Sequence, residues 1–115
     1  MAVDRLKSRF WVQAQIRLCD LANLPAYIVK RGDPDAGAII LRLNRLDGTS
    51  HVFSQARGAD GEAAWAKASG SDADGRLPDA DAETYIARQQ KFDPDIWVLE
   101  IEDPERRYTL DAKIV

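Results

Sequence analysis

The sequence contains one cysteine, one histidine and no long apolar run, and each shortage excludes a class of protein. A single cysteine forms no internal disulfide and rules out a zinc site built from several cysteines. No apolar run approaches the ~18 residues that span a bilayer. Charged residues appear within the first seven positions, so we expect no signal peptide. These shortages predict a cytoplasmic protein of bacterial type with no membrane partner.

The length of 115 residues suits one domain with a core of its own. We therefore expect residues 1–115 to form a single domain. A polar stretch rich in Ser, Gly and Asp over 69–78 predicts a flexible loop, which we extend to about 57–79.

The charge balance excludes a nucleic-acid partner, because 16 basic and 19 acidic residues give a net charge of −3. The charge is uneven along the chain. Residues 1–57 hold nine basic and five acidic residues, a net +4, whereas residues 58–115 hold seven and fourteen, a net −7. The unevenness indicates either a bipolar molecule that meets a charged partner or an ordinary solvated surface.

Helical periodicity predicts a first helix over Ser8–Asn23, with Ser8 as the N-cap and Pro25 ending the run. A helical wheel places polar residues such as Arg17 on one side. The opposite side should be buried, and its members are Phe10, Trp11, Val12, Ala14, Leu18, Cys19, Leu21 and Ala22.

Period-two alternation predicts a three-stranded antiparallel meander over Ala26–Arg31, Ala38–Leu46 and Ser50–Ala56. Asp47-Gly48 is a strong hairpin signal between the second and third strands. A fourth strand is expected over Glu62–Ala68.

A second helix is predicted over Ala80–Phe92, with Asp79 as its cap. Its expected buried stripe comprises Ala82, Tyr85, Ile86, Gln89 and Phe92. Asp93-Pro94 ends this helix, and a strand follows over Asp95–Glu102. A last, short strand is expected over Tyr108–Leu110.

The alternation also predicts which residues share a face of the sheet. One face should lie under both helices and carries Tyr27, Val29, Ile39, Leu41, Leu43, Trp97, Leu99 and Ile101. The other face is half apolar and half charged, with Asn44 and Glu102 beside the interface candidates Ile28, Ile40, Arg42, Ile96, Val98 and Glu100. Either the segment 57–79, including Trp65, covers this second face, or a partner does.

Catalytic chemistry has little support in the sequence. His51 lies within a predicted strand and has no second histidine at metal-ligand spacing, so we expect a surface or cross-strand role. Cys19 is predicted to be a small buried hydrophobe. The stretch Asp72–Gly75 resembles part of a calcium loop but lacks the first and last ligands, and so we expect no metal and no cofactor.

The loops at the two ends of the second predicted strand carry the remaining candidates. Arg and Asn side chains with exposed loop amides can hold a carboxylate or phosphate, whereas Asp residues can also simply cap their own turns. The ligand-binding candidates are Arg17, Arg31, Asp33, Asp35, Asn44 and Arg45.

Three blocks of sequence resemble one bacterial family. They are Arg5–Val12 followed by Arg17 and Cys19, then Arg31–Ala38 with Asn44–Thr49, and finally Phe92–Asp103. The chain resembles the small uncharacterised family "domain of unknown function 1491" over nearly its whole length, least so in 57–78. The resemblance implies a short cytoplasmic domain with no assigned activity and transfers no catalytic residue.

Together these patterns predict an α+β fold: an antiparallel sheet of four to six strands, with two helices on one face. The expected function is a non-enzymatic protein-interaction or regulatory module, homodimeric through the second sheet face. The alternative is a domain that binds a small anion or other small ligand through arginines at the meander loops.

Overall fold

The computed structural model describes residues 7–115. These residues form two helices, α1 (Ser8–Leu21) and α2 (Asp79–Phe92). The strands are β1 (Ala26–Lys30), β2 (Ile39–Asn44), β3 (Thr49–Arg57), β4 (Ala63–Lys67), β5 (Arg76–Pro78), β6 (Trp97–Glu102) and β7 (Lys113–Ile114). The α+β class is confirmed. The strand expected over Tyr108–Leu110 is wrong, because the chain is irregular there and β7 forms further on.

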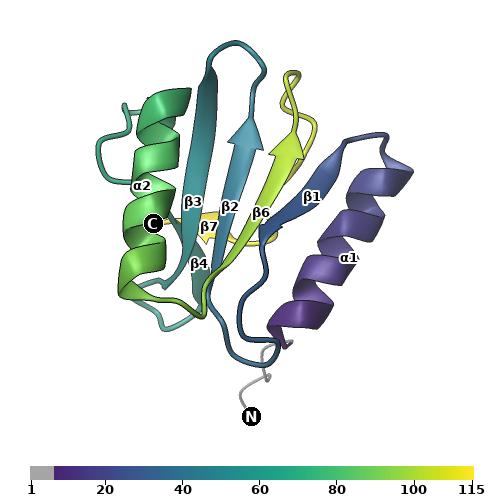
Figure 1. The fold of residues 1–115 in the computed structure, drawn as a ribbon, viewed down its shortest axis with the longest axis vertical. Coiled ribbons are helices and arrows are strands. Elements are labelled where there is room, and N and C mark those ends of the chain that lie inside the picture. Colours follow the sequence, from purple (N-terminus) through teal and green to yellow (C-terminus); the bar gives the residue numbers. More distant parts are fainter. Residues whose placement is uncertain (1–6) are drawn as a thin grey trace.

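The strands form one mixed sheet in the order β1-β6-β2-β3-β4-β7, with β5 paired to β3 (Figure 1). The β2–β3 hairpin is confirmed, with Leu41 opposite Phe53. The antiparallel meander is otherwise wrong, because β6 lies between β1 and β2, antiparallel to the first and parallel to the second. Five of the six residues of β6 are buried, and a strand buried in this way is typical of a position with neighbours on both sides.

The two helices cover opposite faces of the sheet, so the expectation of two helices on one face is wrong (Figure 1). Helix α1 contributes Trp11, Val12 and Cys19 to a core that includes Ile39, Leu41, Leu43, Phe53, Trp65, Trp97, Leu99 and Ile101. Helix α2 contributes Ala82, Tyr85 and Ile86 to a second core with Ile40, Val52, Ala68, Leu77, Ile96 and Val98. The sheet is therefore the middle of three layers.

The segment 57–79, expected mainly as a loop, contains β4, which confirms the strand expected over Glu62–Ala68, and also β5, which was not expected. Its Trp65 packs in the core under α1, away from Ile40 and Val98. Its Ala68 and Leu77 do join the core under α2. The second face is therefore covered mainly by a helix of the same chain.

The two faces of strand β1 are exchanged relative to the prediction: the side chains expected toward the core point away from it. Ile28 lies opposite Leu99 and packs against the core under α1. Tyr27 lies opposite Glu100 and is 42% exposed, and Val29 is 53% exposed at an irregularity in the register. A shift of one residue exchanges the two faces of a strand, and this short strand contains too few residues to reveal its phase.

Neither helix begins with the side-chain cap that the sequence predicts. Lys7 and Pro78 hold the N-cap positions, and neither makes a side-chain capping bond. The Ser8 hydroxyl instead donates to the carbonyl oxygen of Gly37. The carboxylate of Asp79 accepts from the Ser50 hydroxyl at 2.8 Å. Both polar side chains therefore make tertiary contacts in place of capping bonds.

Helix α1 exposes part of the stripe that was expected to be buried. Phe10, Leu18 and Leu21 are 47%, 57% and 68% exposed. The helix ends where Asn23 takes a φ of 59°, and the Leu24 amide donates to the Cys19 carbonyl at 2.8 Å, as in a Schellman motif. In α2, Phe92 of the expected stripe is also exposed. Within residues 7–115 neither helix is long and apolar enough to cross a membrane.

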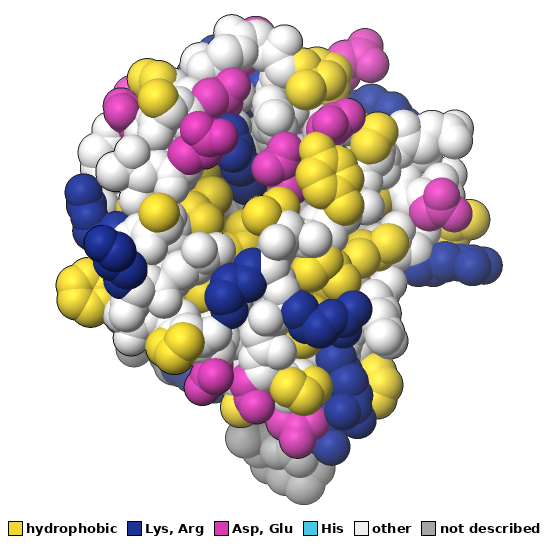
Figure 2. Space-filling view, in the orientation of Figure 1, with side chains coloured by type: hydrophobic (Ala, Val, Ile, Leu, Met, Phe, Trp, Pro, Cys, Tyr) yellow, Lys and Arg dark blue, Asp and Glu magenta, His cyan; other side chains and the backbone are white. Residues whose placement is uncertain are grey.

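The two oppositely charged halves of the chain are interleaved in the sheet. Arg42 pairs with Asp79 at 3.2 Å and with Glu100 at 3.6 Å, and Arg45 pairs with Asp103 at 3.2 Å. On the face drawn in Figure 2, acidic side chains are most numerous near the upper edge, and a smaller acidic group lies at the lower end beside basic side chains. Basic residues of the first half of the chain are thus paired with acidic residues of the second half.

Candidate functional site

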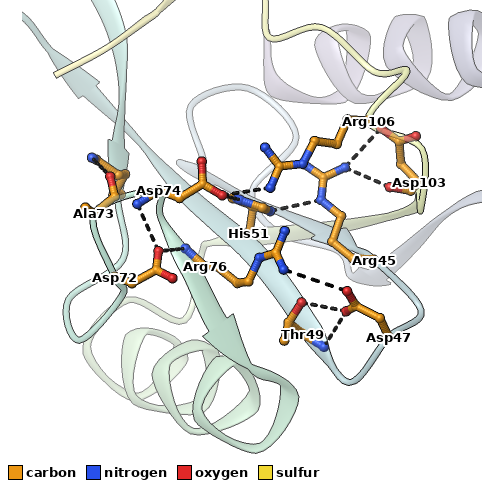
Figure 3. A network of polar contacts seen from close by, with 11 residues as sticks. Arg45, Asp47, Thr49, His51, Asp72, Ala73, Asp74, Arg76, Asp103 and Arg106 are labelled. Atoms are coloured by element: carbon orange, nitrogen blue, oxygen red, sulfur yellow. Dashed lines mark hydrogen bonds and ion pairs between the residues drawn. The ribbon is translucent and has the colours of Figure 1, made fainter.

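The chain after β6 crosses the α1 face of the molecule and begins in a buried polar network (Figure 3). Asp103 is fully buried, and its carboxylate accepts from the backbone amides of Arg107 and Tyr108, each at 2.8 Å. Arg45 donates from Nη1 to the Asp103 carbonyl oxygen at 2.8 Å and to its carboxylate at 3.2 Å. This network fixes the start of the C-terminal segment, residues 103–115, to the end of β2.

His51 lies at the centre of the same network and is 3% exposed. Its Nδ1 accepts from Arg45 Nε at 2.9 Å, and its Nε2 lies 2.9 Å from the Asp74 carboxylate (Figure 3). Arg45 can only donate, so the ring proton must be on Nε2, where it is donated to Asp74. Burial lowers the pKa of His51, and the charge of Arg45 lowers it further. In this arrangement neither ring nitrogen is free to accept a proton, as a general base requires.

Asp74 is held by two partners at the edge of the network. Arg106 donates to it at 2.7 Å, and this bond, with that from His51, holds the pKa of the Asp74 carboxyl well below its usual range. Asp72 accepts from the amides of Asp74 and Arg76, both at 2.9 Å. Asp72 therefore caps its own turn. Among residues 7–115, no group of three or more His, Cys, Asp or Glu side chains is placed to hold a metal ion.

Further along the C-terminal segment, Asp111 joins α1 to β4. One carboxylate oxygen accepts from the indole Nε1 of Trp11 at 2.8 Å, and the other accepts from that of Trp65 at 2.9 Å. The two indole rings lie 5.6 Å apart between centroids, tilted by 49°. Beyond Asp111, β7 pairs with β4 and the Val115 amide donates to the Trp65 carbonyl. The segment is thus held at both ends and at its middle.

A cavity of about 480 Å³ opens beside these two tryptophans. Its walls come from the start of α1, the loop before β2, strands β2, β3 and β4, and the C-terminal segment. The polar side chains that line it are Ser8, Asp35, Gln55 and Asp111. The size lies within the range of small-molecule sites, and mostly apolar walls with a few polar groups are typical of them. We therefore take this cavity as the candidate functional site.

The six predicted ligand-binding residues do not come together. Arg31 lies over the ring of Trp97, 5.5 Å from its centroid, and Asp33 accepts from the amides of its own turn, at Asp35 and Ala36. Of the six, Asp35 alone lines the cavity.

The other three predicted ligand-binding residues are dispersed or engaged. Arg17 is exposed on α1, where it lines a second groove beside β1. Asn44 donates to Glu100 at 3.2 Å and accepts from the amide of Leu46. Arg45 is buried in the network around His51. The loops therefore do not form an anion site built from arginines.

The six interface candidates are placed inside the molecule or at its edge. Ile40, Ile96 and Val98 lie in the core under α2. Arg42 and Glu100 are each less than 10% exposed, and Ile28 packs against the core under α1. The apolar character that suggested a partner surface is explained by α2, which shields this face from water.

Sequence reasoning did not find the central residues of the cavity, Trp11, Trp65 and Asp111. Trp11 and Trp65 were expected in a helix and a strand, with no relation between them. Nothing in the local pattern around Asp111 shows that it meets two indole groups 100 and 46 positions away. Burial of Cys19, by contrast, is confirmed at 1% exposed.

Comparison with known proteins gives one family and several similar solved structures. The family described as "Protein of unknown function (DUF1491)" matches residues 6–111. A crystal structure of a DUF1491 family protein from Caulobacter crescentus CB15 is 35% identical, with a TM-score of 0.84, covering 96% of this chain and 100% of the other. An NMR structure of a DUF1491 family protein from the same source is 34% identical, with a TM-score of 0.81 and coverage of 98% and 99%.

A third similar structure is the solution structure of a protein from A. tumefaciens. It is 28% identical, with a TM-score of 0.69, and covers 89% of both chains. None of the curated proteins matches this chain. The fold and the length are therefore shared by the relatives, and their descriptions name no activity.

Proposed function

The chain belongs to the DUF1491 family of proteins of unknown function, and from the cavity beside Trp11 and Trp65 we propose that it is a non-enzymatic small-ligand-binding module. The observation that carries this proposal is a cavity of about 480 Å³ assembled from parts of the chain far apart in sequence. Drug-sized and metabolite-sized ligands occupy cavities of ~300–1,000 Å³.

The walls of the cavity support a preformed site. Both indole N–H groups are bonded to Asp111, so the two rings are held in fixed orientations. The Gln55 side chain is also fixed, because it accepts from the Ile39 amide at 3.0 Å. A ligand that enters such a site does not have to order these side chains, which lowers the entropic cost of binding.

We propose binding without catalysis because neither the histidine nor the cysteine provides a reactive group at the cavity. The single histidine is engaged by Arg45 and Asp74 and does not line the cavity. The single cysteine is buried, and burial raises the pKa of its thiol. The polar groups on the walls are therefore better suited to orienting a ligand than to transforming it.

Titration of a small-molecule library, followed by the indole N–H resonances of the three tryptophans, tests this function. A ligand in the cavity should shift the resonances of Trp11 and Trp65. The resonance of Trp97 should stay unchanged, because its indole donates to the Asp33 carbonyl outside the cavity. If no compound produces this pattern, the proposed function fails.

A variant that fills the cavity gives a second, independent test. Ala63 lines the cavity and shares the face of β4 that carries Trp65, so Ala63→Leu should block binding. Ala59→Leu adds the same side chain at an exposed position off the cavity and is the matched control. Equal binding by both variants would place the ligand elsewhere.

A second candidate function is self-association through α1. Phe10, Leu18 and Leu21 lie within about 80° of one another around the helix and are 47–68% exposed. Light scattering at micromolar concentration tests this candidate. A dimer that dissociates in Leu18→Glu, but persists in Gln13→Glu elsewhere on the helix surface, supports it; a monomer of 12.8 kDa excludes it.

A further inference from the structure

We infer that the cavity beside Trp11 and Trp65 selects a small organic cation, an ammonium or guanidinium compound, with the Asp111 carboxylate as its main charged contact. This inference rests on the proposed function, because it assigns a ligand class to the same site. It goes further by assigning the sign of the ligand charge and the residue that recognises it.

The charge of the cavity wall is the first argument. Two carboxylates, Asp35 and Asp111, line the cavity, and within residues 7–115 no Lys, Arg or His side chain lines it. Charges of one sign around a cavity with apolar walls attract the opposite charge and disfavour ligands of the same sign. An anionic ligand would therefore meet two like charges on the cavity wall.

The bonding of Asp111 is the second argument. Its two partners, the indoles of Trp11 and Trp65, are neutral donors, so they orient the carboxylate without cancelling its charge. Among residues 7–115 no basic group lies within 4 Å of this carboxylate. Each carboxylate oxygen keeps capacity for a further hydrogen bond, and a cationic N–H donor forms the strongest kind.

Asp35 provides a second negative charge at the cavity, and its contribution to binding a cation should be smaller because it is exposed to solvent. Its contacts with Lys7 at 3.8 Å and Arg9 at 3.5 Å are long, and all three side chains are at least 40% exposed. Exposed pairs of this length contribute little and exchange readily with solvent. Asp35 is thus able to turn toward a cation in the cavity, whereas Asp111 is fixed.

The aromatic wall is the third argument. Trp11 and Trp65 both line the cavity, and an indole is the best of the natural side chains at attracting a cation to its ring face. A carboxylate between two indoles therefore combines a charged hydrogen-bond acceptor with polarisable walls. Neutral ligands of equal shape would use only the walls.

The experiment is a fragment screen in three matched sets. One set contains primary ammonium, guanidinium and quaternary ammonium compounds, and the other two contain their neutral and carboxylate isosteres, compound for compound. Binding is read from the indole resonances of Trp11 and Trp65. Binding confined to the cations, and weakened by salt, supports the inference. Equal or tighter binding of neutral or anionic isosteres overturns it while the proposed function stands, and no binding in any set overturns both.

Variants identify the charged contact. Asp111→Asn should weaken cation binding by about tenfold or more, because a charge-assisted bond is lost. Asp35→Asn, which leaves the indole bonds intact, should weaken it by roughly threefold. Asp60→Asn is the control, because this exposed carboxylate pairs with Lys113 and does not line the cavity. If Asp111→Asn does not fold, Asp35→Asn still decides, since unchanged cation affinity in that variant counts against recognition by wall charge.

Discussion

Arg45 donates from Nε to Nδ1 of His51 at 2.9 Å, and this bond determines which ring nitrogen carries the proton. The imidazole proton is then donated to Asp74, so one buried ring links the end of β2 to the segment before β5. Protonation of Nδ1 would place a second proton where Arg45 already donates. The folded state therefore favours neutral His51.

The first prediction concerns pH. Burial, and then the charges of Arg45 and Arg106, lower the pKa of His51 below its ordinary 6.5, although Asp74 opposes the shift. A group whose pKa falls on folding stabilises the protein fully above its unfolded pKa, and this stability is lost as pH falls through the folded value. The melting temperature of the wild type should therefore decrease as pH falls from about 6.5 to 4.5.

The His51→Gln variant is the control for this titration. Its side chain is polar but does not titrate, so its melting temperature should change less with pH over the same interval. An equal slope in the two proteins would assign the titration to another group.

The second prediction concerns the buried carboxylate of Asp103. Asp103→Ala leaves the guanidinium of Arg45 buried without its charged partner and two backbone amides without an acceptor. Removal of one member of a buried pair costs about 3–5 kcal/mol, which chemical denaturation measures. Asp74→Asn alters an exposed partner instead and keeps an oxygen acceptor for His51, so its loss of stability should be much smaller. Similar losses in the two variants would contradict the role given to burial.

The third prediction separates steric from conformational demands on glycine. A Cβ at Gly32 would lie 2.1 Å from the Asp95 carbonyl oxygen, which is backbone and cannot move aside. Gly32→Ala should therefore lower the free energy of unfolding by about 3 kcal/mol, the upper part of the range for overpacking. Gly48 has open space around it but a φ of +88°, so Gly48→Ala should cost only about 1 kcal/mol. The reverse order of the two losses would show that the loop before β2 is not packed as described.

The fourth prediction concerns the face covered by α2. Ile40 is 0% exposed beneath this helix, so Ile40→Ala should cost about 2–5 kcal/mol by loss of buried surface and creation of a cavity. Light scattering of the variant should show the same mass as the wild type, because the side chain is covered by its own chain. A change of mass with little change in stability would instead indicate an interface.

Local chemistry in the sequence was sufficient for both helices and for most strands, but not for β5 and β7. Asp47-Gly48 specified the hairpin between β2 and β3, Pro25 marked the limit of α1, and Asp93-Pro94 marked that of α2. Turn residues and side-chain periodicity act over a few positions, so they can be read from one stretch of chain. The three sequence blocks likewise identified the family.

Tertiary structure decided the strand order, the faces covered by the helices and the site. Insertion of β6 between β1 and β2 depends on hydrogen bonds between strands about 70 positions apart, which no local pattern records. Two-residue periodicity distinguishes the two sides of a strand but does not say which helix covers each. Asp111 meets Trp11 and Trp65 only because the C-terminal segment crosses α1 and pairs with β4. These contacts join segments that are far apart in the sequence, so they exist only once the whole chain has folded and no short stretch of sequence records them.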